Sequence, residues 1–128
     1  MTAPTYRLSN TVLGAPDPRA LGRFYRALLG WELREEEDEW VVLKPPGATG
    51  PSIGLAFQLE DGHVPPTWPA GPGDQQMQAH LDIGVADLEA GVAHAESLGA
   101  TQAGHQPQDD VRVMLDPAGH PFCLFTDA

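Results

Sequence analysis

The sequence predicts an α+β fold in which the order strand, helix, three strands (βαβββ) occurs twice. The strings VVLKPPG, residues 41–47, and VMLDPAG, residues 113–119, share Val, Leu, Pro and Gly at corresponding places. Upstream of each string, an apolar strand is followed by an Asp and by an amphipathic helix pattern. This repeated order of elements indicates two related modules in one chain.

The first module is expected at about residues 6–60. Asp17 follows its first apolar strand and offers a carboxylate that can cap the free N–H groups of a helix. Apolar side chains recur behind it at helical spacing, and Gly30 supplies a common helix stop. We predict a helix at 18–29 and strands near 7–15, 31–37, 40–44 and 52–59.

The second module is expected at about residues 77–127 and repeats this order. Asp87 stands where Asp17 stands in the first module, and Gly99 ends the helix pattern as Gly30 does. We predict a helix at 88–98 and strands near 78–85, 100–106, 111–115 and 121–126.

The last two strands are joined by DPAG, residues 116–119, which has the residues of a type I turn. Asp116 can bond back to the backbone, Pro117 presets φ and Gly119 closes the turn. We therefore predict that the turn is structural and sets the register of the strand that carries Cys123. No neighbouring Lys, Arg or helix start is visible to activate that thiol, so an apolar strand should raise its pKa.

A Pro- and Gly-rich linker, about residues 61–76, connects the modules. Loops of this length usually have a function of their own, and Trp68 in its middle predicts that the linker packs against another surface. We expect it to act as a lid or as a partner contact.

Composition narrows the class of protein. A chain of 128 residues with 41% hydrophobic residues predicts one compact domain, 1–128. The net charge of −11 argues against nucleic acid and anionic membranes as partners and would suit a cationic ligand. One cysteine excludes an internal disulfide. The absence of a spanning stretch and of a signal-peptide pattern predicts a cytoplasmic protein.

The chain resembles the vicinal oxygen chelate superfamily, which comprises glyoxalases, bleomycin resistance proteins and extradiol dioxygenases, and within it the glyoxalase-like branch. The resemblance rests on the paired βαβββ order and on FYRALLGWEL (24–33), HLDIGVADLEAGVAHAESLGA (80–100) and DPAGHPFCLF (116–125). It implies two modules about a pseudo-twofold axis, curved mixed sheets enclosing a cavity, helices outside, and a homodimer.

Metal-dependent members of this superfamily carry ligands on the first and last strand of each module. Carried over, these positions hold Asn10, Gln58, His80 and Cys123. Strand alternation supports the second module: Leu81, Ile83 and Val85 form an apolar side, so His80 and Asp82 point the other way. In the last strand, Cys123 and Phe125 likewise point to the face opposite to that of Phe122 and Leu124. The choice of Gln58 stays open, because one alignment of the modules matches Leu55 with Cys123 instead.

Only His80 among the four is a strong ligand for a catalytic divalent metal such as Zn, Fe, Mn or Ni. We therefore expect no metal cofactor, although a Zn site from His80 and Cys123 is chemically conceivable. The preferred hypothesis is a metal-free protein that binds a small, possibly cationic molecule in the sheet cavity. The residues expected to line that cavity are Asn10, Gln58, His80, Cys123, Phe125 and Trp68.

The alternative is an enzyme, a lyase, isomerase or dioxygenase on a small oxygenated metabolite, that uses His80 as a base or as its one strong metal ligand. A third hypothesis is a regulatory or assembly domain without a working cavity.

Overall fold

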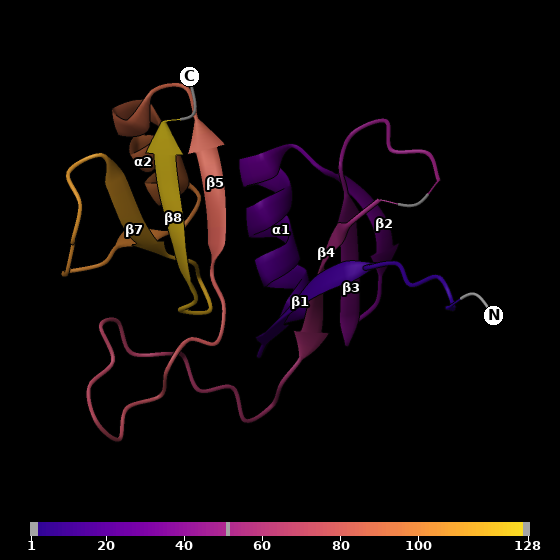
Figure 1. The fold of residues 1–128 in the computed structure, drawn as a ribbon, viewed down its shortest axis with the longest axis horizontal. Coiled ribbons are helices and arrows are strands. Elements are labelled where there is room, and N and C mark those ends of the chain that lie inside the picture. The colour runs from indigo at the N-terminus through magenta and orange to yellow at the C-terminus, as the bar shows by residue number, and fades with distance from the viewer. Residues whose placement is uncertain (1–2, 51, 127–128) are drawn as a thin grey trace. The chain divides into compact units, whose positions relative to one another are not determined.

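The structure is a computed structural model that describes residues 3–50 and 52–126. The chain separates into two compact units, Met1–Asp61 and Gly62–Ala128. Each unit contains one βαβββ module with a four-stranded mixed sheet (Figure 1). The predicted α+β class and both modules are confirmed. The predicted end of module two at residue 127 lies outside the described residues.

Module one has the strand order β1-β4-β3-β2, with β1 parallel to β4 and the other pairs antiparallel. Its elements are β1 (Asn10–Ala15), α1 (Pro18–Leu29), β2 (Glu32–Glu36), β3 (Trp40–Lys44) and β4 (Gly54–Leu59).

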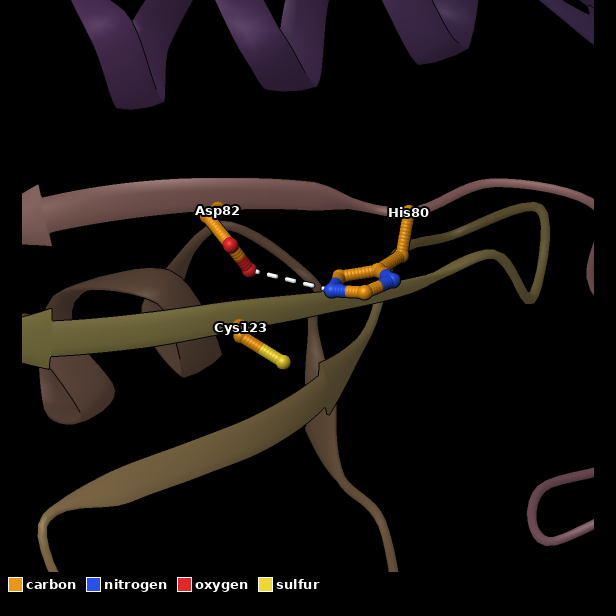
Figure 2. A group of neighbouring side chains, drawn as sticks. All are labelled: His80, Asp82 and Cys123. Carbon is orange, nitrogen blue, oxygen red and sulfur yellow. Dashed lines mark ion pairs between the residues drawn. The ribbon is translucent and has the colours of Figure 1, made fainter.

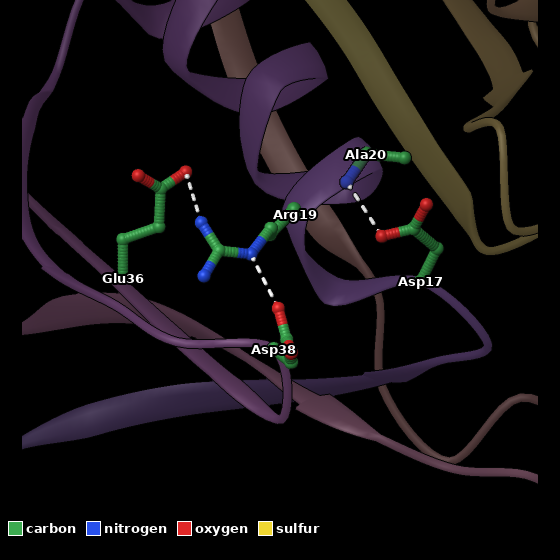
Figure 3. Close-up of polar contacts among 5 residues, drawn as sticks. All are labelled: Asp17, Arg19, Ala20, Glu36 and Asp38. Atoms are coloured by element: carbon green, nitrogen blue, oxygen red, sulfur yellow. Dashed lines mark hydrogen bonds and ion pairs between the residues drawn. The ribbon is translucent and has the colours of Figure 1, made fainter.

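The helix of module one is fixed at both ends by the residues that the sequence indicated. Asp17 accepts a hydrogen bond from the backbone N–H of Ala20 at 3.1 Å, and Gly30 ends the helix at φ 71°. Arg19 in the first turn contacts Glu36 at 3.3 Å and Asp38 at 3.0 Å, tying α1 to the β2–β3 turn (Figure 3). These ion pairs are exposed, so each contributes less than about 1 kcal/mol.

The core of module one lies between α1 and one face of its sheet. Tyr25 and Phe57 are fully buried and stack with ring centroids 5.6 Å apart. A side chain at Gly22 would come within 2.8 Å of Val41, so the helix approaches β3 closely there. Val41 and Phe57 therefore face α1, and Val42 and its partner residue Ala56 lie on the other face.

Module two has the matching strand order β5-β8-β7-β6. Its helix begins behind Asp87, which accepts a hydrogen bond from the backbone N–H of Ala90 at 3.1 Å, as predicted. The elements are β5 (Leu81–Val85), α2 (Leu88–Ser97), β6 (Thr101–Gln102), β7 (Val111–Leu115) and β8 (Pro121–Thr126).

Strand β6 is much shorter than the expected 100–106. Beyond Gln102 one backbone hydrogen bond remains, from the N–H of Ala103 to the carbonyl of Val113 at 3.0 Å, and the side chain of Gln106 supplies the other contacts with β7. Its Nε2 donates to the carbonyls of Ala103 and Val113 at 2.9 Å, and its Oε1 accepts from the N–H of Val113 at 2.8 Å. The chain can therefore leave the sheet at residue 103 without leaving the N–H and carbonyl of Val113 unpaired.

Strands β1 and β5 start later than the predicted residues 7 and 78. Each is parallel to one neighbour, and that neighbour begins only at Gly54 or at Pro121. The residues before Asn10 and Leu81 therefore have little or no partner strand. Strand β4 likewise begins at Gly54 rather than at residue 52.

The turn after β7 has the structure that its sequence predicts. Asp116 is buried, and its Oδ1 accepts from the N–H groups of Ala118 at 2.9 Å and His120 at 3.0 Å. The N–H of Gly119 closes the turn onto the carbonyl of Asp116 at 2.8 Å, and Gly119 has φ 88°. The turn is structural and fixes where β8 begins.

We expect Gln106→Ala to lower the free energy of unfolding by about 1–3 kcal/mol, because the part-buried N–H of Val113 and carbonyl of Ala103 lose their partner, whereas the carbonyl of Val113 keeps its bond from the N–H of Ala103. Urea unfolding measures this change. Gln102→Ala on the same edge is the control, since its exposed side chain should contribute less than about 0.5 kcal/mol. Equal effects of the two substitutions would contradict the role assigned to Gln106.

Candidate functional site

Three polar side chains meet on one face of the module-two sheet. His80 precedes β5 by one residue, and Asp82 follows two residues later on the same side of the strand. Strand β8 runs parallel to β5 with Cys123 opposite Asp82. The donor atoms of His80, Asp82 and Cys123 lie within 4.8 Å of one another (Figure 2).

The opposite face of these strands explains why the three side chains point this way. A side chain at Gly91 of α2 would come within 2.8 Å of Val85, so Val85 faces the helix. Phe122 and Leu124 are almost fully buried, and Leu124 pairs with Ile83. Burial of this apolar row under α2 turns Asp82 and Cys123 to the other side.

Asp82 brings a negative charge into the cluster. Its Oδ1 lies 3.1 Å from Nε2 of His80, and Figure 2 shows the imidazole turned toward the carboxylate. Partial burial, and then the charge of Asp82, raise the pKa of the Cys123 thiol. The predicted direction is therefore confirmed, and the thiol is held neutral at physiological pH.

The cluster forms one wall of a pocket of about 470 Å³. Phe125, Val111 and Cys123 supply apolar surface, and the carboxylates of Asp82 and Asp110 supply negative charge. None of the described residues that line it is Lys or Arg. The complete lining is His80, Asp82, Gln108, Asp110, Val111, Cys123, Phe125 and Thr126.

Asn10 and Gln58 belong to module one and lie on the face of its sheet that α1 does not cover. Asn10 pairs with Gly54 and Gln58 with Gly14, so they stand four residues apart along β1. The Oδ1 atom of Asn10 is buried with no hydrogen-bond partner among the described residues, whereas Gln58 donates to Glu60 at 3.4 Å. When the modules are matched at their helix caps Asp17 and Asp87, Val12 corresponds to Asp82. Val12 pairs with Ala56 and Asp82 with Cys123, so the counterpart of Cys123 is Ala56.

Trp68 is not among the residues that line the pocket. Its indole N–H donates to the carbonyl of His105 at 3.1 Å, in the connection between β6 and β7. The linker also contacts module two at its start, where Nε2 of His63 lies 2.7 Å from the carbonyl oxygen of Ala118.

His80, Cys123 and Phe125, three of the six residues expected to line the cavity, lie in this pocket, whereas Asp82, Gln108 and Asp110 line it without having been among the expected residues. Asp82 could have been found, because alternation puts it on the same side as His80. Gln108 and Asp110 carried no periodic signal, since they lie in the irregular β6–β7 connection.

The three donors suit Zn²⁺ by type, because imidazole, carboxylate and thiolate all bind this metal. Two donors of one tetrahedral site are about 3.3–3.6 Å apart, which is closer than the widest spacing here. The side chains of His80 and Asp82 are 37% and 64% exposed, so little packing opposes a small movement toward a common ion. The residues therefore fit a zinc ion after a small side-chain movement and deprotonation of Cys123.

We expect Asp82→Asn to speed alkylation of Cys123 by the neutral reagent iodoacetamide at neutral pH. Loss of the carboxylate lowers the pKa of the thiol and increases the thiolate fraction. The rate measured as a function of pH tests this, with Asp109→Asn as the control. Rapid labelling of the folded wild-type protein that disappears in His80→Ala would contradict it and reveal a Cys–His pair.

Neither helix in the described part of the chain is long and apolar enough to cross a membrane. No curated protein matches the sequence.

Solved structures with this fold cover almost the whole chain at low identity. A glyoxalase/bleomycin resistance protein/dioxygenase family enzyme from Burkholderia phytofirmans PsJN is 18% identical with TM-score 0.69, over 96% of this chain and 100% of that one. Glyoxalase I of Leishmania major is 18% identical with TM-score 0.64, over 96% and 88%. A bleomycin resistance determinant encoded on the transposon Tn5 is 17% identical with TM-score 0.59, over 94% and 98%.

A family model described as a glyoxalase-like domain matches residues 10–125. The match begins with β1 and ends within β8, so it includes both modules and the linker. The chain belongs to the glyoxalase-like domain family of the vicinal oxygen chelate superfamily.

Proposed function

We propose that this protein binds a small organic cation in the module-two pocket. The observation that supports the proposal is that two carboxylates, Asp82 and Asp110, and the aromatic ring of Phe125 line the same pocket. Small-molecule sites combine apolar walls with a few converging polar groups, and this pocket has that composition. The net charge of −11 would add long-range attraction for a cation.

Each lining group has a role in this binding. Asp82 and Asp110 would neutralise the ligand charge, and the ring face of Phe125 offers a cation–π contact. His80 is oriented by its contact with Asp82 and can hydrogen bond to a polar substituent of the ligand. Cys123, kept neutral, would serve as a wall residue and would form no covalent bond.

The fold is shared with a bleomycin resistance determinant and with a glyoxalase I. Likeness of fold therefore supports a binding protein and an enzyme equally, and the lining of the pocket favours the binding protein.

We expect benzylammonium to bind more tightly than benzyl alcohol, and benzoate to bind least, in NMR titrations that follow backbone amides. Asp82→Asn and Asp110→Asn should each weaken benzylammonium binding by about two- to fivefold, because each removes one partly exposed attractive charge. Asp109→Asn is the matched control, since Asp109 adjoins the pocket residues but does not line the pocket. Tighter binding of benzoate, or an equal effect of Asp109→Asn, would contradict the proposal.

A second candidate is a metal-dependent or His-based lyase, isomerase or dioxygenase, favoured by the His80, Asp82 and Cys123 cluster. These three side chains would hold a divalent ion, which when bound would supply Lewis acidity for an oxygenated substrate. Without metal, His80 is the residue that could move a proton, and Asp82 would hold its ring in place.

Metal content separates the two candidates. We expect the protein purified without added metal to carry less than about half an equivalent of Zn, Fe, Mn or Ni per chain, since His80 is the only strong neutral ligand of the cluster and Cys123 would first have to lose its proton. Elemental analysis gives this number. Stoichiometric metal that is lost in His80→Ala, with Asp109→Asn unchanged, would favour the enzyme.

A further inference from the structure

We propose that Trp68 is a positioning residue that sets the charge preference of the module-two pocket. It acts through the β6–β7 connection, residues 103–110, which carries Gln108 and Asp110 to the pocket wall. This inference deepens the proposed function and rests on it for the identity of the pocket as a ligand site.

The β6–β7 connection has few internal supports. Near its start the Gln106 side chain binds Ala103 and Val113. At its end Nη1 of Arg112 donates to the carbonyl of Gln108 at 3.3 Å, a long contact. The hydrogen bond from Trp68 to His105 comes from outside the connection and its flanking strands. Trp68 and His105 also lie with ring centroids 6.1 Å apart.

Trp68 can hold the connection because its own segment is closed and anchored. The N–H of Thr67 donates to the carbonyl of Gln75 at 2.8 Å, which closes a loop that has Trp68 at its base. Within this loop Oδ2 of Asp74 accepts from the N–H of Gly71 at 2.9 Å. Upstream, Nε2 of His63 donates to the carbonyl of Ala118, so the linker is fixed to the β7–β8 turn as well.

The chain continues from this linker through residues 77–79 to His80. One segment therefore contributes to two walls of the pocket: it leads to His80, and it supports the connection that bears Asp110. Attraction between a cation and a carboxylate falls with distance. A change in the position of Asp110 would therefore alter the charge preference of the pocket more than the stability of the module.

Cys123 provides a test that needs no knowledge of the natural ligand. It is the one cysteine of the chain, and it lines the pocket. Two methanethiosulfonate reagents of similar size, one bearing a trimethylammonium group and one a sulfonate, both convert the thiol to a mixed disulfide and release methanesulfinate. The ratio of their rates, divided by the same ratio for the protein unfolded in urea, measures the charge preference of the folded pocket.

We expect this normalised ratio to favour the cationic reagent in the wild-type protein. Trp68→Phe keeps an aromatic ring and removes the N–H donor, and should lower the ratio by about two- to fivefold. Asp110→Asn should lower it similarly, and the double variant should fall no further than Asp110→Asn alone, because coupled residues are not additive. Hydrogen exchange of residues 103–110 should accelerate in Trp68→Phe.

Trp31→Phe in module one is the matched control and should leave the ratio unchanged. If circular dichroism shows that Trp68→Phe does not fold, Trp68 can be replaced site-specifically by benzothienylalanine. This residue keeps the ring volume and lacks only the N–H. An unchanged ratio in the folded variant, or effects of Trp68 and Asp110 that add in full, would overturn the inference. Failure of the proposed function is seen separately, as absent benzylammonium binding in a protein whose ratio still responds to both substitutions.

Discussion

The parallel register between β5 and β8 is the constraint on which the site depends. Strand alternation has a period of two, so a slip of one residue would exchange the two faces of a strand. Here the register is held by the apolar row that contains Ile83, Phe122 and Leu124, which is covered by α2. Once that row is buried, Asp82 and Cys123 must lie side by side on the face of the sheet that α2 does not cover. The buried core of module two therefore dictates the composition of its pocket.

The two-module architecture could be predicted because it rests on local signals that agree with the tertiary structure. Asp17 and Asp87 cap their helices as expected, and the apolar spacing of both helices gives one buried face. In the structure, however, the alignment of the strings 41–47 and 113–119 is shifted by one residue relative to the positions that correspond in the two turns. In the first turn the N–H of Ala48 donates to the carbonyl of Pro45, and in the second the N–H of Gly119 donates to the carbonyl of Asp116. Val41 consequently faces its helix, whereas Val113 pairs with Cys123 on the free face.

The same offset decides which residue of module one corresponds to Cys123. Sequence matching left Leu55 and Gln58 as alternatives, but the strand pairing selects Ala56, which lies between them. The remainder of the site was beyond prediction for a different reason. Gln108 and Asp110 lie in a connection held by the side chains of Gln106, Arg112 and Trp68, and such contacts leave no periodic pattern in a sequence.

The charge that would attract a cationic ligand also suppresses nucleophilic chemistry in this pocket. A reactive cysteine needs positive potential that stabilises its thiolate, as a neighbouring cation or helix N-terminus provides. Here the opposite holds: burial, and then the charge of Asp82, raise the pKa of Cys123 above its ordinary value. The neutral thiol then favours the folded state, and this contribution is present at neutral pH and is lost as the pH rises above the ordinary thiol pKa. A bound cation would partly offset the field of Asp82 and lower the pKa of Cys123, so ligand binding and thiol ionisation are thermodynamically linked in the same pocket.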